Sequence, residues 1–148
     1  KVRLYQARIC NRATASNVAD FQIVVKRADS NNIFLKMDIE GSEYLVIDDI
    51  IKNSPKIIGM VIEFHDTGPL RLVFNDSVKK LQNVYELVHI HANNYCSFSV
   101  DGVPEALELT FVKKNLCSSR GKRVSLPLPG LDQPSNPDNQ DYSMKFAF

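Results

Sequence analysis

FLKMDIEGSEYLVI, residues 34–47, changes halfway along from the hydrophobic pattern of a strand to that of a helix. The apolar run at residues 33–39 follows a turn-forming stretch and stops before Gly41, which is typical of a strand buried on both faces. Residues 42–53 then space large apolar side chains along one helical face, and Pro55 ends the helix. The segment therefore predicts a strand that passes directly into a helix.

Downstream of this segment, the sequence predicts three more strands. KIIGMVIEFH, residues 56–65, is a second apolar run, so residues 33–65 form a strand–helix–strand unit with parallel strands. An amphipathic helix follows at residues 70–81, then a strand at 85–91 and another at 107–114. The link between the last two strands is short and contains no helix, so we expect them to be antiparallel.

The sequence predicts a helix near the amino terminus and an extended tail at the carboxyl terminus. Residues 17–28 favour a helix, with Asn17 as its N-cap and Asp20 at the third helical position, although FQIVV at residues 21–25 also suits a strand. Residues 118–148 are rich in proline and show no period, which predicts an extended tail packed on the domain. We therefore expect one domain over residues 1–148.

Composition is that of an ordinary globular protein, with 44% hydrophobic residues, 24% charged residues and a net charge of +1. Such a small charge favours neither nucleic acid nor an anionic membrane as partner. Cys10, Cys96 and Cys117 are odd in number and match no zinc spacing. Since the amino terminus also lacks the apolar region of a signal peptide, we expect a cytoplasmic protein.

Three of the expected strands end in a pair of polar residues that are spaced two apart. They are Asp38 and Glu40, Glu63 and His65, and His89 and His91. Side chains two apart on a strand share a face, and α/β sheets bind ligands at the carboxyl ends of their strands. The pairs could simply be solvated strand ends. Otherwise they predict a rim holding a general base, a hard cation such as magnesium, or a transition metal, and the sequence leaves these open.

The same residues resemble a known family. Residues 34–47 resemble the K-x-D-x-E-G-x-E motif of FkbM-like methyltransferases at Lys36, Asp38, Glu40, Gly41 and Glu43. MVIEFH, VHIHANNY, LELTFVKK and LDQPSNPDNQDY are similar to later segments of that family, so the resemblance covers residues 33–142.

This resemblance implies a fold and an activity. The fold is the α/β, Rossmann-like class I methyltransferase sheet, mostly parallel with one antiparallel strand, of which this chain would carry the carboxyl-terminal half. The activity is methyl transfer from S-adenosylmethionine, typically to a hydroxyl oxygen of a small molecule or sugar. The glycine-rich turn that holds the cofactor in such folds is not found among these residues, so an upstream segment would have to supply it.

The resemblance also implies roles for individual residues. The catalytic candidates are Asp38, Glu63 and His65. The cofactor-binding candidates are Asp38, Glu40 and Gly41. The substrate-binding candidates are His89, His91 and Asn94.

Two other functions remain open from the sequence. The first is a non-catalytic binding or assembly module, in which missing strands leave an open sheet edge for a partner or a second copy of the chain. The second is a metal-dependent hydrolase that uses the rim of carboxylates and histidines.

Overall fold

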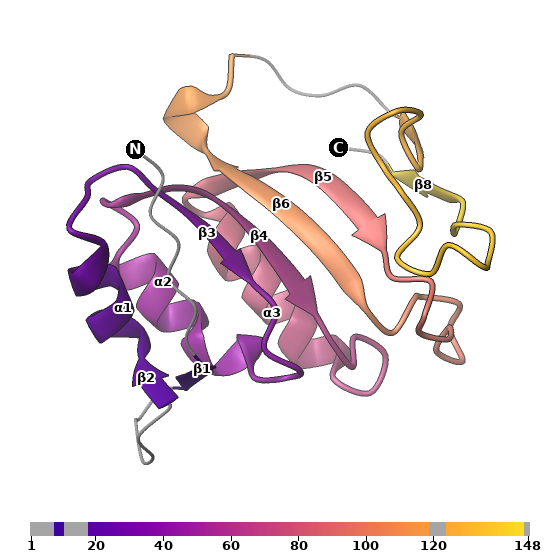
Figure 1. Ribbon diagram of the computed structural model, residues 1–148, viewed down its shortest axis with the longest axis horizontal. Coiled ribbons are helices and arrows are strands. Elements are labelled where there is room, and N and C mark those ends of the chain that lie inside the picture. Colours follow the sequence, from indigo (N-terminus) through magenta and orange to yellow (C-terminus); the bar gives the residue numbers. More distant parts are fainter. Residues whose placement is uncertain (1–7, 11–17, 119–123, 147–148) are drawn as a thin grey trace.

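A four-stranded sheet organises the computed structural model, which describes residues 8–10, 18–118 and 124–146 (Figure 1). Its strands are β3 (Ile33–Met37), β4 (Ile57–Phe64), β5 (Tyr85–Ala92) and β6 (Leu107–Lys113). They lie in the order β3-β4-β6-β5. The fold is thus a small α/β fold built on an open, mixed sheet.

The sheet pairs β3 with β4 in parallel, whereas β6 is antiparallel to both β4 and β5. The expected strand–helix–strand unit and the expected antiparallel pair are both confirmed. By its pairings, however, the sheet is mostly antiparallel, although a mostly parallel sheet was expected. The cause is the position of β6, because one reversed strand inserted between two others makes both of its pairings antiparallel. As a result β3, β4 and β5 run in the same direction and end at the same edge.

Short helices cover one face of the sheet. They are α1 (Phe21–Ala28), the 3-10 turn η1 (Glu43–Val46), α2 (Ile47–Lys52) and α3 (Arg71–Gln82). Figure 1 shows α2 and α3 behind the sheet, and Phe64 of β4 packs edge-on against Phe74 of α3 with ring centroids 5.4 Å apart. Within the described residues, no helix combines the length and the apolar character that crossing a membrane requires.

The buried core lies between this face and the helices. The fully buried strand residues include Met37, Met60, Ile62, Leu109 and Phe111, and the helices add Ile47, Ile50 and Leu81.

The opposite face is more exposed, and Phe34 lies across it. A β-carbon at Gly59, the register partner of Phe34, would lie 2.9 Å from Phe34 Cε2 and 3.0 Å from the Phe111 carbonyl oxygen. The absence of a side chain at residue 59 therefore lets the phenyl ring rest on the backbone of β4.

The first described helix begins later than the sequence predicted. Residues Val18–Asp20 form strand β2, which pairs in parallel with β1 (Arg8–Cys10), so Val18 is not on a helical face. Asp20 is the N-cap instead, because its carboxylate accepts a hydrogen bond from Gln22 N–H at 2.7 Å directly before the apolar run. Asn17, the predicted cap, lies outside the described residues.

The carboxyl-terminal segment packs against the end of β5. It contains β7 (Val124–Leu126) and β8 (Met144–Phe146), which pair in antiparallel fashion. The predicted tail of residues 118–148 is therefore partly regular, and its residues 119–123 and 147–148 lie outside the described ranges.

Truncating the core tests this arrangement. Ile62→Ala removes a fully buried side chain at the centre of the sheet and should lower the free energy of unfolding by about 2–5 kcal/mol in urea titration. Val88→Ala, on the exposed side of β5, should change it by less than about 1 kcal/mol. Equal decreases in the free energy of unfolding of the two variants would contradict the burial of Ile62 between the sheet and the helices.

Candidate functional site

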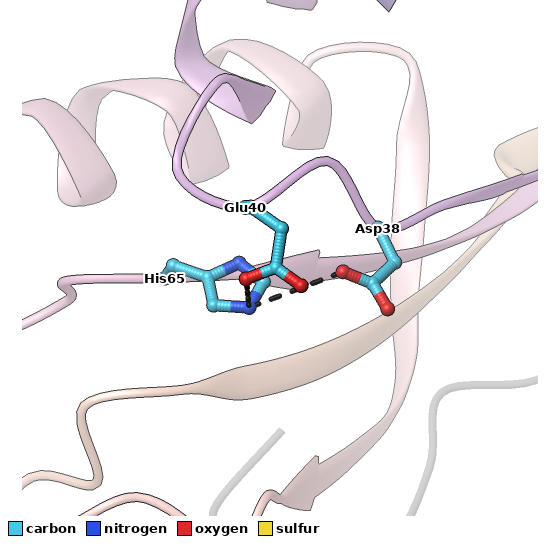
Figure 2. A group of neighbouring side chains, drawn as sticks. All are labelled: Asp38, Glu40 and His65. Atoms are coloured by element: carbon cyan, nitrogen blue, oxygen red, sulfur yellow. Dashed lines mark ion pairs between the residues drawn. The ribbon is translucent and has the colours of Figure 1, made fainter. Parts of the chain in front are cut away.

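Asp38, Glu40 and His65 come together where β3 and β4 end (Figure 2). His65 Nε2 lies 3.9 Å from Asp38 Oδ1 and 3.7 Å from Glu40 Oε2. Asp38 follows β3 directly and His65 follows β4 directly, so the parallel pairing of these strands places both groups at one edge. Left-handed backbone at Glu40 (φ 56°) and Gly41 (φ 91°) turns the chain back over His65, which explains the glycine.

The carboxylate of Glu43 contacts both this loop and the imidazole of His65. Its side chain is fully buried, and Oε1 accepts hydrogen bonds from Ile39 N–H at 3.0 Å and Gly41 N–H at 3.2 Å. The same oxygen lies 3.1 Å from His65 Nδ1. One carboxylate therefore holds both the loop after β3 and the ring after β4.

These contacts determine how His65 presents its second nitrogen. Oε1 of Glu43 is an acceptor in all its contacts, so the proton of the shared hydrogen bond belongs on His65 Nδ1. Nε2 is then directed at Asp38 and Glu40 (Figure 2). Glu43 Oε2 is buried and has no hydrogen-bond partner among the described residues.

A negative electrostatic field surrounds the cluster. Burial raises the pKa of the Cys96 thiol, and the charges of Glu63, Glu105, Glu40 and Asp66 raise it further. Because the charges of these four carboxylates all raise the pKa of one thiol, the carboxylates act on the same region around Cys96. In a chain with a net charge of +1, the site is thus locally acidic.

Tyr44 and Lys36 border the acidic cluster, and the charge of Lys36 interacts with those of Asp38 and Glu63. Burial, followed by the charges of Glu43 and Asp66, raises the pKa of Tyr44, whose hydroxyl donates to the His65 carbonyl at 2.5 Å. Lys36 donates to Glu108 at 2.7 Å, and this hydrogen bond raises the pKa of Lys36.

The other predicted site residues lie elsewhere. Glu63 is on β4 and accepts a hydrogen bond from Asn93 Nδ2 at 2.7 Å, and it is not part of the cluster around His65. His89 and His91 are on β5. Two strands lie between β5 and β3, so β5 and β3 are roughly 14 Å apart at the usual strand spacing. The common strand direction was therefore predicted correctly, but the inserted β6 keeps the histidine pair away from Asp38.

The substrate-binding candidates contact the carboxyl-terminal segment instead. His89 Nε2 lies 2.7 Å from Asp132 Oδ1, and His91 Nε2 lies 2.9 Å from Asp141 Oδ2. Asn94 accepts from Asn136 N–H at 2.6 Å and donates to the carbonyls of that segment. Their role toward a substrate stays a prediction, and it requires this segment to move or to line the substrate site itself.

Sequence reasoning missed the part played by Glu43, which it named only as one residue of the motif at residues 34–47. A signal was present, because Glu in the first turn can reach back to free N–H groups, as in a capping box. Its contact with His65, 22 residues away, is tertiary and has no local signature.

Comparison of the chain with protein-family models, with curated proteins and with solved structures finds no match. The chemistry of the site therefore rests on its own residues. An imidazole oriented by a buried carboxylate, beside two exposed carboxylates, can accept a proton, hold a cationic ligand or bind a metal ion.

The negative field is testable at Cys96. Because the thiolate is the reactive form and the pKa of Cys96 is raised, alkylation by iodoacetamide at pH 8 should be slow. Glu63→Gln removes one raising charge, so the apparent pKa should fall and alkylation at pH 8 should accelerate. Glu86→Gln, at the other end of β5, serves as the control and should leave the rate unchanged. Peptide mass spectrometry against pH measures each rate, and a faster reaction in the control alone would contradict the described field.

Proposed function

We propose that this chain is the carboxyl-terminal part of an S-adenosylmethionine-dependent methyltransferase that modifies a hydroxyl oxygen of a small molecule or sugar. The observation that carries the proposal is the convergence of Asp38, Glu40 and His65 at the carboxyl ends of β3 and β4. Two of these residues belong to the stretch that resembles the FkbM-like motif.

The sheet supports this proposal at a coarser level. The resemblance implies that the four strands are the last four of a class I methyltransferase sheet, with one reversed strand among them. Strand β6 is such a strand, and β3, β4 and β5 share one direction. Their carboxyl ends face the edge where α/β folds bind ligands.

The charge of the site suits the methyl donor. The donor is a sulfonium cation, and Asp38, Glu40 and Glu63 give this edge of the sheet a negative field. At 4 Å, one carboxylate attracts a unit positive charge by about 1 kcal/mol in bulk water and about 4 kcal/mol near a protein surface. In this proposal, Asp38 lies beside the donor and Glu40 with Gly41 forms the turn that borders it.

His65 would receive the proton of the acceptor. With Nδ1 held by Glu43, Nε2 can take the hydroxyl proton while the oxygen attacks the methyl carbon in line with the departing sulfur. The carbon–sulfur bond breaks, its electron pair stays on sulfur, and the neutral thioether leaves. Such oriented proton transfer typically contributes about 10²–10⁴-fold in rate.

The second candidate function, a non-catalytic binding module, has its own supporting observation. Among the described residues, β3 pairs on one side only, and Phe34 on this strand is 57% exposed. An unpaired strand edge with an exposed phenyl ring can add a strand from a partner.

Donor binding separates the two functions. Calorimetric titration of S-adenosylmethionine should show binding by the chain joined to the proposed upstream segment with the glycine-rich turn, and Asp38→Asn in that protein should weaken binding about tenfold, since one lost charge contact is worth about 1.4 kcal/mol. Asp76→Asn, an exposed carboxylate on α3, is the matched control and should not change the dissociation constant.

If that longer protein folds but fails to bind the donor, the result favours the binding module instead. Sedimentation equilibrium then checks that alternative, because self-association through β3 makes the mass depend on concentration. A Phe34→Asp variant should abolish such a dependence.

A further inference from the structure

We infer that Asp38, Glu40 and His65 form a binding site for one divalent transition metal ion of the Mn²⁺ or Zn²⁺ type, with Glu43 as the residue that positions His65. This inference rests on the geometry of the cluster and does not depend on methyl transfer.

The three ligand atoms are already close to the separation that a metal requires. Nε2 of His65, an oxygen of Asp38 and an oxygen of Glu40 all lie within 4.8 Å of one another (Figure 2). Metal bonds of about 2.0–2.2 Å to nitrogen and oxygen place neighbouring ligand atoms about 3.0–3.5 Å apart. The side chains of Asp38 and Glu40 are 43% and 86% exposed, so both can rotate inward to close this difference.

The hydrogen bonding of His65 matches that of a metal ligand. Histidine ligands usually donate their other ring N–H to a carboxylate, which fixes the tautomer and the orientation of the ring. Glu43 Oε1 occupies that position at 3.1 Å from Nδ1. The neutral ring then points the lone pair of Nε2 at two carboxylates, which repel it unless a positive charge lies between them.

The buried carboxylate of Glu43 also favours a cation close to the His65 ring. Glu43 is fully buried, and its second oxygen has no hydrogen-bond partner within the described part of the chain. A buried charge is costly unless it is paired or faces a metal. Asp38 and Glu40 add two further negative charges. Lys36 interacts with the charge of Asp38 but hydrogen-bonds Glu108, and a single proton on His65 would offset one of the remaining charges. A divalent cation above the ring offsets two.

The ligand set also selects the kind of metal. Mg²⁺ and Ca²⁺ prefer oxygen ligands alone, whereas one imidazole with two carboxylates suits Mn²⁺, Zn²⁺ and related ions. Three protein ligands leave coordination positions open for water or for a hydroxyl of a bound molecule. If the proposed methyl transfer holds, a metal bound at Nε2 would exclude His65 as the proton acceptor. The metal would then acidify the acceptor hydroxyl, and the released proton would pass to solvent water.

Metal titration tests the site in the chain without any donor. After dialysis against EDTA and then metal-free buffer, Mn²⁺ titration followed by the electron paramagnetic resonance of free Mn²⁺ should show one bound ion per chain. Zn²⁺ should displace it, and equal Mg²⁺ should displace it much less. His65→Gln should weaken Mn²⁺ binding at least tenfold, whereas His89→Gln, which alters a histidine that contacts Asp132, should not.

The positioning role of Glu43 has a separate readout. Glu43→Gln keeps the shape of the side chain and should weaken Mn²⁺ binding by about 10–100-fold, the usual effect of removing a partner of a metal ligand. Nitrogen-15 spectra of the His65 ring should show the proton on Nδ1 in the unaltered chain and a mixture of tautomers in the variant. Circular dichroism and the Tm check that each variant is folded, and Glu43→Asp replaces Glu43→Gln if the latter unfolds.

Several outcomes overturn the inference. Absence of Mn²⁺ and Zn²⁺ binding by the folded chain at millimolar metal removes the site, and so does equal weakening by His65→Gln and His89→Gln. A proton on Nε2 in place of Nδ1 removes the role of Glu43. Metal binding without donor binding by the longer protein supports this site and removes the methyltransferase, whereas donor binding by a protein that binds no metal does the reverse.

Discussion

The contact between the buried Glu43 carboxylate and His65 is the interaction on which the rest of the site depends. A carboxylate without solvent must find donors, and Glu43 finds them in two backbone N–H groups of the loop after β3 and in the ring after β4. This requirement bends the loop so that Asp38 and Glu40 approach the ring. One buried charge thus shapes both sides of the candidate site.

The sheet supplies the frame for this interaction. Because β3 and β4 are parallel neighbours joined by the η1–α2 crossover, the residues that follow them lie at one edge. Helices cover one face of the sheet (Figure 1). The side chains of Asp38 and Glu40 are exposed, whereas that of Glu43 is fully buried and that of His65 is mostly buried. The site therefore combines a buried pair, Glu43 and His65, with two exposed carboxylates beside it.

Much of this architecture follows from local patterns. The switch in hydrophobic period at residues 34–47 predicted the strand–helix–strand unit, and the position of polar residues after β3 and β4 predicted Asp38, Glu40 and His65 as neighbours. The position of His91 could not be predicted in this way, because the carboxyl-end rule gives an edge but not a distance along it. Its partner Asp141 lies 50 residues away, and the insertion of β6 depends on pairing between distant segments. Glu43 was missed for the same reason, since its burial is a tertiary property.

On the exposed face of the sheet, the ring of Phe34 occupies the space that a side chain at residue 59 would need. Position 59 is therefore not free to vary alone. A side chain there would displace the ring and loosen the pairing of the strand that carries Asp38, and its β-carbon would also lie 3.0 Å from the Phe111 carbonyl oxygen. A smaller residue at 34 would relieve only the first contact, so in homologous chains residue 59 should stay glycine even where residue 34 is small.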